Sequence, residues 1–139
     1  TTNEDILNFG KALDETVISI KAEDKKKSLE QLANLYEYLP KYIDGLSIEE
    51  SRKNILQTKY NILRAYSIVE DENWKEVQNQ LEQADTAYTK VINDVNYIQN
   101  KQEEVLRVYV LIKELRNSVS LKDKDIFYIK YKNLMNAIQ

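Results

Sequence analysis

Residues that break helices are almost absent from this chain: among its 139 residues there are two glycines and one proline. These are the two residue types that most disfavour a helix interior. Apolar residues instead recur every three or four positions along most of the sequence, and this spacing places them on one face of a helix. The sequence therefore predicts an all-α fold.

The apolar spacing predicts about six helical segments, which group into three helical hairpins of similar size. The first hairpin comprises a helix from about Asn3 to Ile20 and a second helix that begins near Leu29. Pro40 should end or kink the second helix, and Gly45 can adopt the conformation that closes it. The polar stretch 21–27 contains no helix breaker, so residues 3–44 could instead form one long helix.

The second hairpin begins with Ser47, which together with Glu50 matches the capping-box pattern for a helix from Ile48 to about Glu70. Asn73, with Glu76 three residues later, gives a second helix-start signal. An unbroken seam of apolar positions with alternating spacings of three and four follows, at Trp74, Val77, Leu81, Ala84, Tyr88, Val91, Val95 and Ile98.

The seam can be extended through Gln102, Val105, Tyr109 and Ile112. We favour a joint near Asn100, with a single helix over 73–118, about 69 Å long, as the alternative. The last helix should begin between Ser120 and Asp123, with its apolar face at Phe127, Tyr131, Leu134 and Ile138.

The joints within the three hairpins resemble one another, which raises the question of a repeat. A Ser–Ile or Ser–Val pair precedes an aspartate at Ser19, Ser67 and Ser118, with spacings of 48 and 51 residues. Two-residue echoes arise easily by chance in a chain rich in Lys, Asn and Ile, so unrelated hairpins are the favoured interpretation. We expect residues 1–139 to form a single antiparallel helical bundle.

Composition excludes several classes of function. The net charge of −3 argues against nucleic-acid binding, and no apolar run approaches the roughly 18 residues that cross a bilayer. Histidine and cysteine are absent, which removes the commonest general base, the thiol nucleophile and the usual transition-metal ligands. The acidic clusters at 70–72, 103–104 and 123–125 lack the pattern of a calcium loop, and we expect them to be helix ends or solvated faces.

No group of residues therefore indicates chemistry. We expect no catalytic, cofactor-binding or metal-ligating residues and no cofactor, and the sequence does not define the binding residues. A non-enzymatic protein is the favoured reading.

Tyrosine is abundant, with ten residues. Six of them lie on or beside apolar stripes, where packing at the edge of the core is favoured over an aromatic groove for a ligand: Tyr36, Tyr42, Tyr66, Tyr88, Tyr109 and Tyr131. Trp74 is likewise expected in the core rather than at a partner surface. The segment 127–132 interleaves aromatics with lysines, but helical spacing separates the two kinds of side chain.

Two resemblances follow from these residues. The hairpin around Ala65, Leu81 and Ala84 is similar to a tetratricopeptide hairpin, but it lacks the closing proline and its spacing exceeds 34 residues. Trp74 at the start of a long amphipathic helix and the ending at 122–134 resemble small lipoproteins of clostridia and related Gram-positive bacteria. That resemblance implies a lipidated cysteine upstream of Thr1 and an extracytoplasmic location.

The chain begins at Thr1 and its one methionine is Met135, so we expect a trimmed leader or a cleaved targeting segment before it. The favoured hypothesis is an extracytoplasmic, lipid-anchored helical module that binds another protein or has a structural role. It would touch the membrane only through an N-terminal lipid. A cytosolic tetratricopeptide-like adaptor that holds a peptide beside Tyr66 and Tyr88 is the first alternative. A small-molecule binder with its ligand between helices is the second.

Overall fold

The computed structural model describes residues 8, 10–11, 27–32, 34 and 49–138 of the chain. Within those residues the fold is all-α, as predicted, and contains no strand. The four longer helices are α3 (Glu50–Val69), α4 (Trp74–Ile92), α6 (Gln102–Ser118) and α7 (Lys124–Ala137). A short helix, α5 (Val95–Ile98), lies between α4 and α6, and a 3-10 turn, η2 (Val119–Leu121), precedes α7.

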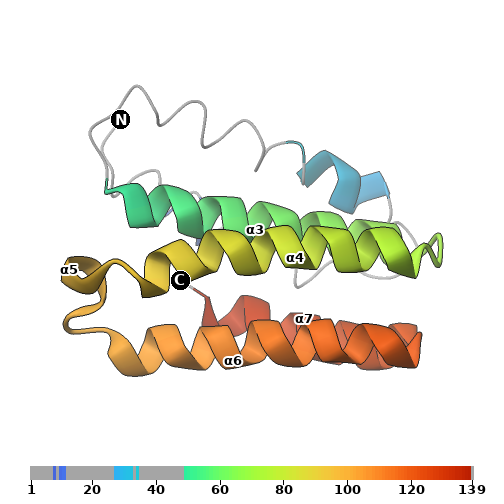
Figure 1. Ribbon diagram of the computed structural model, residues 1–139. Coiled ribbons are helices and arrows are strands. Elements are labelled where there is room, and N and C mark those ends of the chain that lie inside the picture. The colour runs from blue at the N-terminus through green and yellow to red at the C-terminus, as the bar shows by residue number, and fades with distance from the viewer. Residues whose placement is uncertain (1–7, 9, 12–26, 33, 35–48, 139) are drawn as a thin grey trace.

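The helices form two layers of antiparallel pairs (Figure 1). One layer holds α3 and α4, and the other holds α6 and α7, with α4 against α6 and α3 against α7. The helical residues 27–32 lie on the side of α3 that faces away from the second layer, where Leu29 is fully buried. The second and third predicted hairpins are therefore confirmed. The boundary at 40–47 and most of the first hairpin lie outside the described residues.

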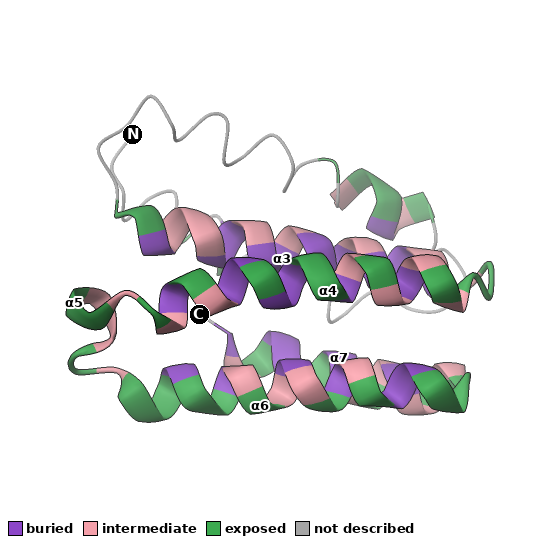
Figure 2. Cartoon of the chain, in the orientation of Figure 1, coloured by how far each residue is buried: buried purple, intermediate pink, exposed green. Residues whose placement is uncertain are grey.

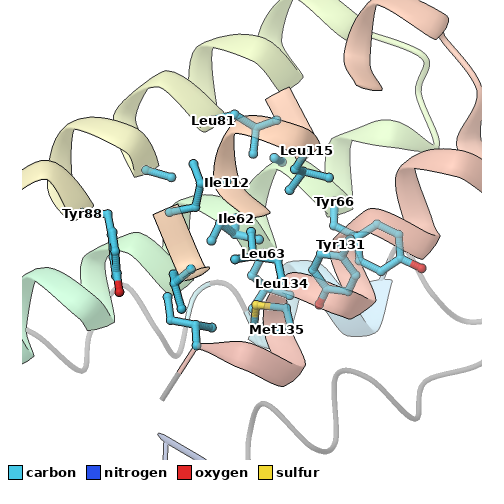
Figure 3. Close-up of a cluster of buried hydrophobic side chains, with 14 of the residues drawn as sticks. Ile62, Leu63, Tyr66, Leu81, Tyr88, Ile112, Leu115, Tyr131, Leu134 and Met135 are labelled. Atoms are coloured by element: carbon cyan, nitrogen blue, oxygen red, sulfur yellow. The ribbon is translucent and has the colours of Figure 1, made fainter. Parts of the chain in front are cut away.

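The core lies between the two layers and extends across α3 toward Leu29. Every residue of the predicted seam from Val77 to Val91 is buried, and so are Phe127, Tyr131 and Leu134 of α7 and its C-cap Ile138. Figure 3 shows Leu81, Ile112 and Leu115 meeting side chains of α3 and α7 in one cluster. Antiparallel helices with apolar stripes spaced in this way bury those stripes together.

Aromatic rings fill the contact between α3 and α7. The Tyr66 ring lies 4.1 Å from the Tyr131 ring and 6.4 Å from the Phe127 ring, measured between centroids. Trp74 meets Phe127 edge to face at 6.1 Å. Trp74, Tyr66 and Tyr131 therefore pack in or against the core, as predicted. Tyr36 and Tyr42 lie outside the described residues.

One part of the predicted seam is wrong. The chain leaves the helix at Asn93, so the break begins earlier than the expected joint near Asn100 and the single helix over 73–118 does not form. The Asp94 side chain accepts a hydrogen bond from the Tyr97 backbone N–H (3.2 Å) and another from the Ser51 hydroxyl (2.6 Å). Asp competes with the helical backbone in this way and favours a cap. Val95, predicted to be buried, is 74% exposed as a result.

The helix starts agree more closely with the sequence. The Asn73 side chain accepts a hydrogen bond from the Glu76 backbone N–H, as predicted, and Asp123 caps α7 through the N–H groups of Asp125 and Ile126. The helix α3 begins at Glu50, after the N-cap Glu49, two residues later than expected. Ser47 lies outside the described residues.

Candidate functional site

Three features of the described surface could serve a function: a charged cluster around Asp85, a polar groove between α3 and α4, and an apolar stripe on α6. The sequence singled out none of them. A feature whose polar and charged groups are already satisfied within the chain offers a ligand little to bind.

The charged cluster joins α4 to α6. The Asp85 carboxylate accepts hydrogen bonds from Lys113 Nζ and Arg116 Nη1, each at 2.5 Å, and one from the Thr89 hydroxyl at 3.2 Å. Glu82 lies 3.9 Å from Arg116 at the edge of the cluster. Burial by itself would raise the pKa of Asp85, but the two cations outweigh burial and hold that pKa below its usual range.

In the other direction, the hydrogen bond that Lys113 donates to Asp85 raises the pKa of Lys113. Both shifts favour the charged forms of Asp85 and Lys113 at neutral pH, and the carboxylate has two cations beside it. A carboxylate in this state is a poor general base, because its proton affinity has been lowered. The cluster acts as a cross-link between the two layers.

The groove lies between α3 and α4 and has a volume of about 400 Å³. Five amide side chains dominate its lining: Asn54, Gln57, Asn61, Asn79 and Gln83. The other lining residues are Glu82, Thr86, Ala87 and Lys90. Asn61 is almost fully buried and lies at the centre of an amide network. It accepts a hydrogen bond from Gln57 (3.0 Å) and donates to Gln80 (3.1 Å). A buried amide between paired helices fixes how they align, which is the structural role of this network.

The third feature is a row on the outward side of α6, which we call the α6 outer stripe: Glu103, Leu106, Val110, Lys113 and Asn117. The side chains of Leu106 and Val110 are 54% and 53% exposed, although both are large and apolar. They lie one helical turn apart on the same face. Figure 2 shows exposed residues along the outward edge of α6, and the buried ones on the edge that faces α4 and α7.

The α6 outer stripe has a counterpart on α3, fifty residues earlier, where each position is either buried or partly buried. Leu56 corresponds to Leu106 and is buried, and Leu63 corresponds to Lys113 and is fully buried. Gly10 lies against this face of α3, since a Cβ at Gly10 would be 3.7 Å from Leu56 Cδ2. In total 12 of the 20 residues of α3 are buried, against five of the 17 in α6. The α6 helix is therefore packed on one side only.

The aromatic residues that could have formed a peptide groove or a base-stacking surface are mostly buried. Tyr66 and Tyr88, which would line the groove of a peptide adaptor, are each 2% exposed and belong to the core, so they line no open groove. Burial raises the pKa of both phenols well above the usual value. Phe127 and Tyr131 are fully buried, while Lys132 is exposed, so these two aromatic rings are not available for stacking on bases.

The acidic clusters lie at helix ends, as expected. Asp123 caps α7, and Lys124 reaches both Glu70 (3.8 Å) and Glu72 (3.9 Å), which links the two hairpin turns. In the part of the chain that the structure describes, no three His, Cys, Asp or Glu residues come together as metal ligands. Likewise, no described helix combines the length and apolar character that crossing a membrane requires.

A signal for the α6 outer stripe was present in the sequence. Residues 105–112 read Val-Leu-Arg-Val-Tyr-Val-Leu-Ile, with Arg107 as the one charged residue. A helix that packs on one side needs apolar residues along one face only, and not on all sides. The excess of apolar residues in 105–112 indicated a second face to cover. The groove gave no comparable signal, because Asn and Gln on helix surfaces are ordinary.

Comparison with protein-family models, with curated proteins and with solved structures finds no significant match to this chain.

Proposed function

We propose that this protein is a protein-interaction module and that the α6 outer stripe is its contact surface. The observation that supports the proposal is the pair Leu106 and Val110, two large apolar side chains more than half exposed on one face of α6. Scattered apolar residues are normal on a protein surface. This pair differs from the corresponding residues of α3, since Leu56 is buried beside Gly10 and Tyr60 is partly buried.

An interaction role also agrees with how the reactive groups are used. Asp85 is neutralised by two cations, and the phenols of Tyr66 and Tyr88 are held in the protonated form within the core. These groups hold the helices together. A helical face with apolar anchors one turn apart is a common way of recognising another helix.

Site-specific photocrosslinking tests the proposal. A photoreactive amino acid replaces Leu106, and in a matched protein it replaces Asn136, an exposed residue of α7. Each protein is expressed in cells that make the natural one, irradiated and analysed by mass spectrometry. We expect discrete adducts with a protein from position 106 and none from position 136. Equal labelling at the two positions, or none at either, contradicts the proposal.

We further propose that the module is displayed outside the cytoplasmic membrane on an N-terminal lipid. The resemblance to small clostridial lipoproteins supports this location. Mass spectrometry of the native N-terminus, together with fractionation of the source cells, tests it. A diacylglyceryl cysteine in the membrane fraction agrees with the proposal, and an unmodified protein in the cytosol contradicts it.

Binding of a small polar ligand in the groove between α3 and α4 is a second candidate function, because the volume of the groove falls in the range of ligand sites. The amides of the lining can both donate and accept hydrogen bonds. Thermal-shift measurements with a panel of sugars and amino acids test this candidate. A shift that disappears in Gln83→Leu, with Asn136→Leu as the control, supports it, and no shift with any compound counts against it.

A further inference from the structure

The α6 outer stripe has the spacing of a coiled-coil seam. Its members Glu103, Leu106, Val110, Lys113 and Asn117 follow one another at intervals of three, four, three and four residues. This is the repeat by which two helices pack along each other. The face that carries the stripe lies opposite the buried residues Val105, Val108, Ile112 and Leu115. Its apolar centre, Leu106 and Val110, is exposed, and Lys113 at its edge reaches Asp85 of α4.

The charges on the stripe make it complementary to itself in one direction. In an antiparallel pair of α6 helices centred between Leu106 and Val110, each Leu106 faces a Val110. Each Glu103 then faces a Lys113, because the two positions lie at equal distances from the centre. A parallel pair would instead place Glu103 opposite Glu103 and Lys113 opposite Lys113, and like charges in contact are unfavourable.

Lys113 can serve both contacts. Its side chain is 42% exposed although Nζ already donates to Asp85. An ammonium group has three donors, and with Asp85 and the Tyr109 hydroxyl as partners one remains for a second carboxylate. Arg116 also binds Asp85, which therefore stays neutralised if Lys113 turns partly outward.

We propose that this protein associates with a second copy of itself through antiparallel pairing of α6, with Leu106 against Val110 of the second copy and Glu103 against Lys113 of the second copy. This rests on the proposed function and names the partner for the same surface. A helix of 17 residues is roughly 25 Å long, and a contact along one such helix is smaller than the roughly 1,600 Å² of a standard interface. The dimer is weak, so it forms and dissociates with concentration.

The first test is sedimentation equilibrium of the purified chain from micromolar to millimolar concentration. We expect a reversible monomer–dimer equilibrium that Val110→Glu weakens by at least about tenfold, because the change places a carboxylate in the apolar centre. Ile129→Glu is the matched control, since Ile129 is a similarly exposed apolar residue on α7. Circular dichroism of each variant establishes that it is folded. A chain that stays monomeric throughout, or equal effects of the two variants, overturns the proposal.

The second test fixes the direction of pairing and uses the absence of cysteine from the chain. Leu106→Cys and Val110→Cys proteins are prepared separately, mixed in equal amounts and oxidised slowly. Antiparallel pairing should give more mixed disulfide than the statistical half, because a disulfide requires close Cβ atoms. Predominant 106–106 and 110–110 products indicate parallel pairing and overturn the proposal.

Different outcomes count against the dimer and against the interaction surface. If the chain is monomeric but position 106 crosslinks to a different protein, the self-association is wrong and the interaction surface stands. If position 106 captures neither a copy of the chain nor another protein, the proposed function fails as well.

Discussion

The second helices of the two hairpins, α4 and α7, place buried residues at the same positions, shifted by 50 residues, with different side chains, whereas the first helices, α3 and α6, differ in how many residues they bury. Val77, Leu81 and Ala84 of α4 correspond to Phe127, Tyr131 and Leu134 of α7, and all six are fully buried. The turns also correspond, since Glu72 and Lys122 both have positive φ (55° and 50°) and each precedes an N-cap whose side chain caps the helix. The spacings of 48 and 51 seen in the sequence came close to this shift. The first hairpin lies outside the described residues.

The difference between the hairpins appears where one meets the other. A shift of 50 residues pairs α3 with α6 and α4 with α7. The contact of α4 with α6 therefore corresponds to the contact of α7 with α3. Asp85, bound by Lys113 and Arg116, thereby corresponds to Met135. Arg116 corresponds to Tyr66, which stacks on Tyr131. The contact between α4 and α6 is ionic, and the contact between α7 and α3 is aromatic. Corresponding positions between two helices can therefore hold either kind of side chain, provided that buried polar groups are hydrogen-bonded.

The largest expected effect tests whether the two hairpins share one core. Leu81→Ala should lower the free energy of unfolding by about 2–5 kcal/mol, and Tyr131→Ala at the corresponding position by about 3–5 kcal/mol, because each leaves a cavity. Urea unfolding followed by circular dichroism measures both. A cost near zero for either variant would show that its hairpin packs loosely and would break the comparison.

The ionic contact should be worth less than the core. Asp85→Ala leaves two cations without their carboxylate, and we expect a loss of about 1–3 kcal/mol after allowing for the partial exposure of both. Glu82→Ala is the control, because Glu82 is exposed and 3.9 Å from Arg116, and it should cost under about 0.5 kcal/mol. Equal losses would show that the cluster is solvated and not structural.

The two N-caps should contribute equally if the turns are equivalent. Asn73→Ala removes the acceptor for the Glu76 backbone N–H, and Asp123→Ala removes the acceptor for those of Asp125 and Ile126. Each change should cost about 0.5–2 kcal/mol. Thermal unfolding of the two variants, side by side, gives the comparison. A clearly larger loss at one turn would mean that its hairpin depends more on the cap and that the correspondence is only geometrical.

Acid should separate the two inter-hairpin contacts. The folded-state pKa of Asp85 is lowered, so its contribution is present above the unfolded value of about 3.9 and is lost as the pH falls through the folded-state pKa. The aromatic contact between Tyr66 and Tyr131 has no group that titrates there. We expect unfolding free energy to fall less steeply with acid in Asp85→Ala than in the natural chain. Parallel pH profiles would contradict an ionic cross-link.

The sequence predicted the parts of the fold that depend on residues close together in the chain. Local patterns predicted the cap at Asn73, a helix start between Ser120 and Asp123 and the stripe from Val77 to Val91, and all three are present. Val95 continued that spacing, yet it is exposed because Asp94 bonds to Ser51, 43 residues earlier. No local pattern contains that contact.

The candidate site was not predicted for the same reason. Leu106 and Leu56 are the same residue type on helices of similar pattern, and one is exposed while the other is buried. Whether a second apolar face is covered depends on how many hairpins flank the helix, which is a property of the assembled layers. The Asp85 cluster joins residues 28 and 31 positions apart and was equally hidden.

The short turns after α3 and α6 have a consequence for how the chain folds. Glu70 to Asn73 and Val119 to Asp123 bring antiparallel helices together across a few residues, so the two hairpins close small loops. Proteins dominated by such local contacts fold quickly, because little chain entropy is lost before contacts form. Each hairpin is thus suited to be an early folding unit. The slower step is then their docking, where Asp85 must find cations from the other hairpin.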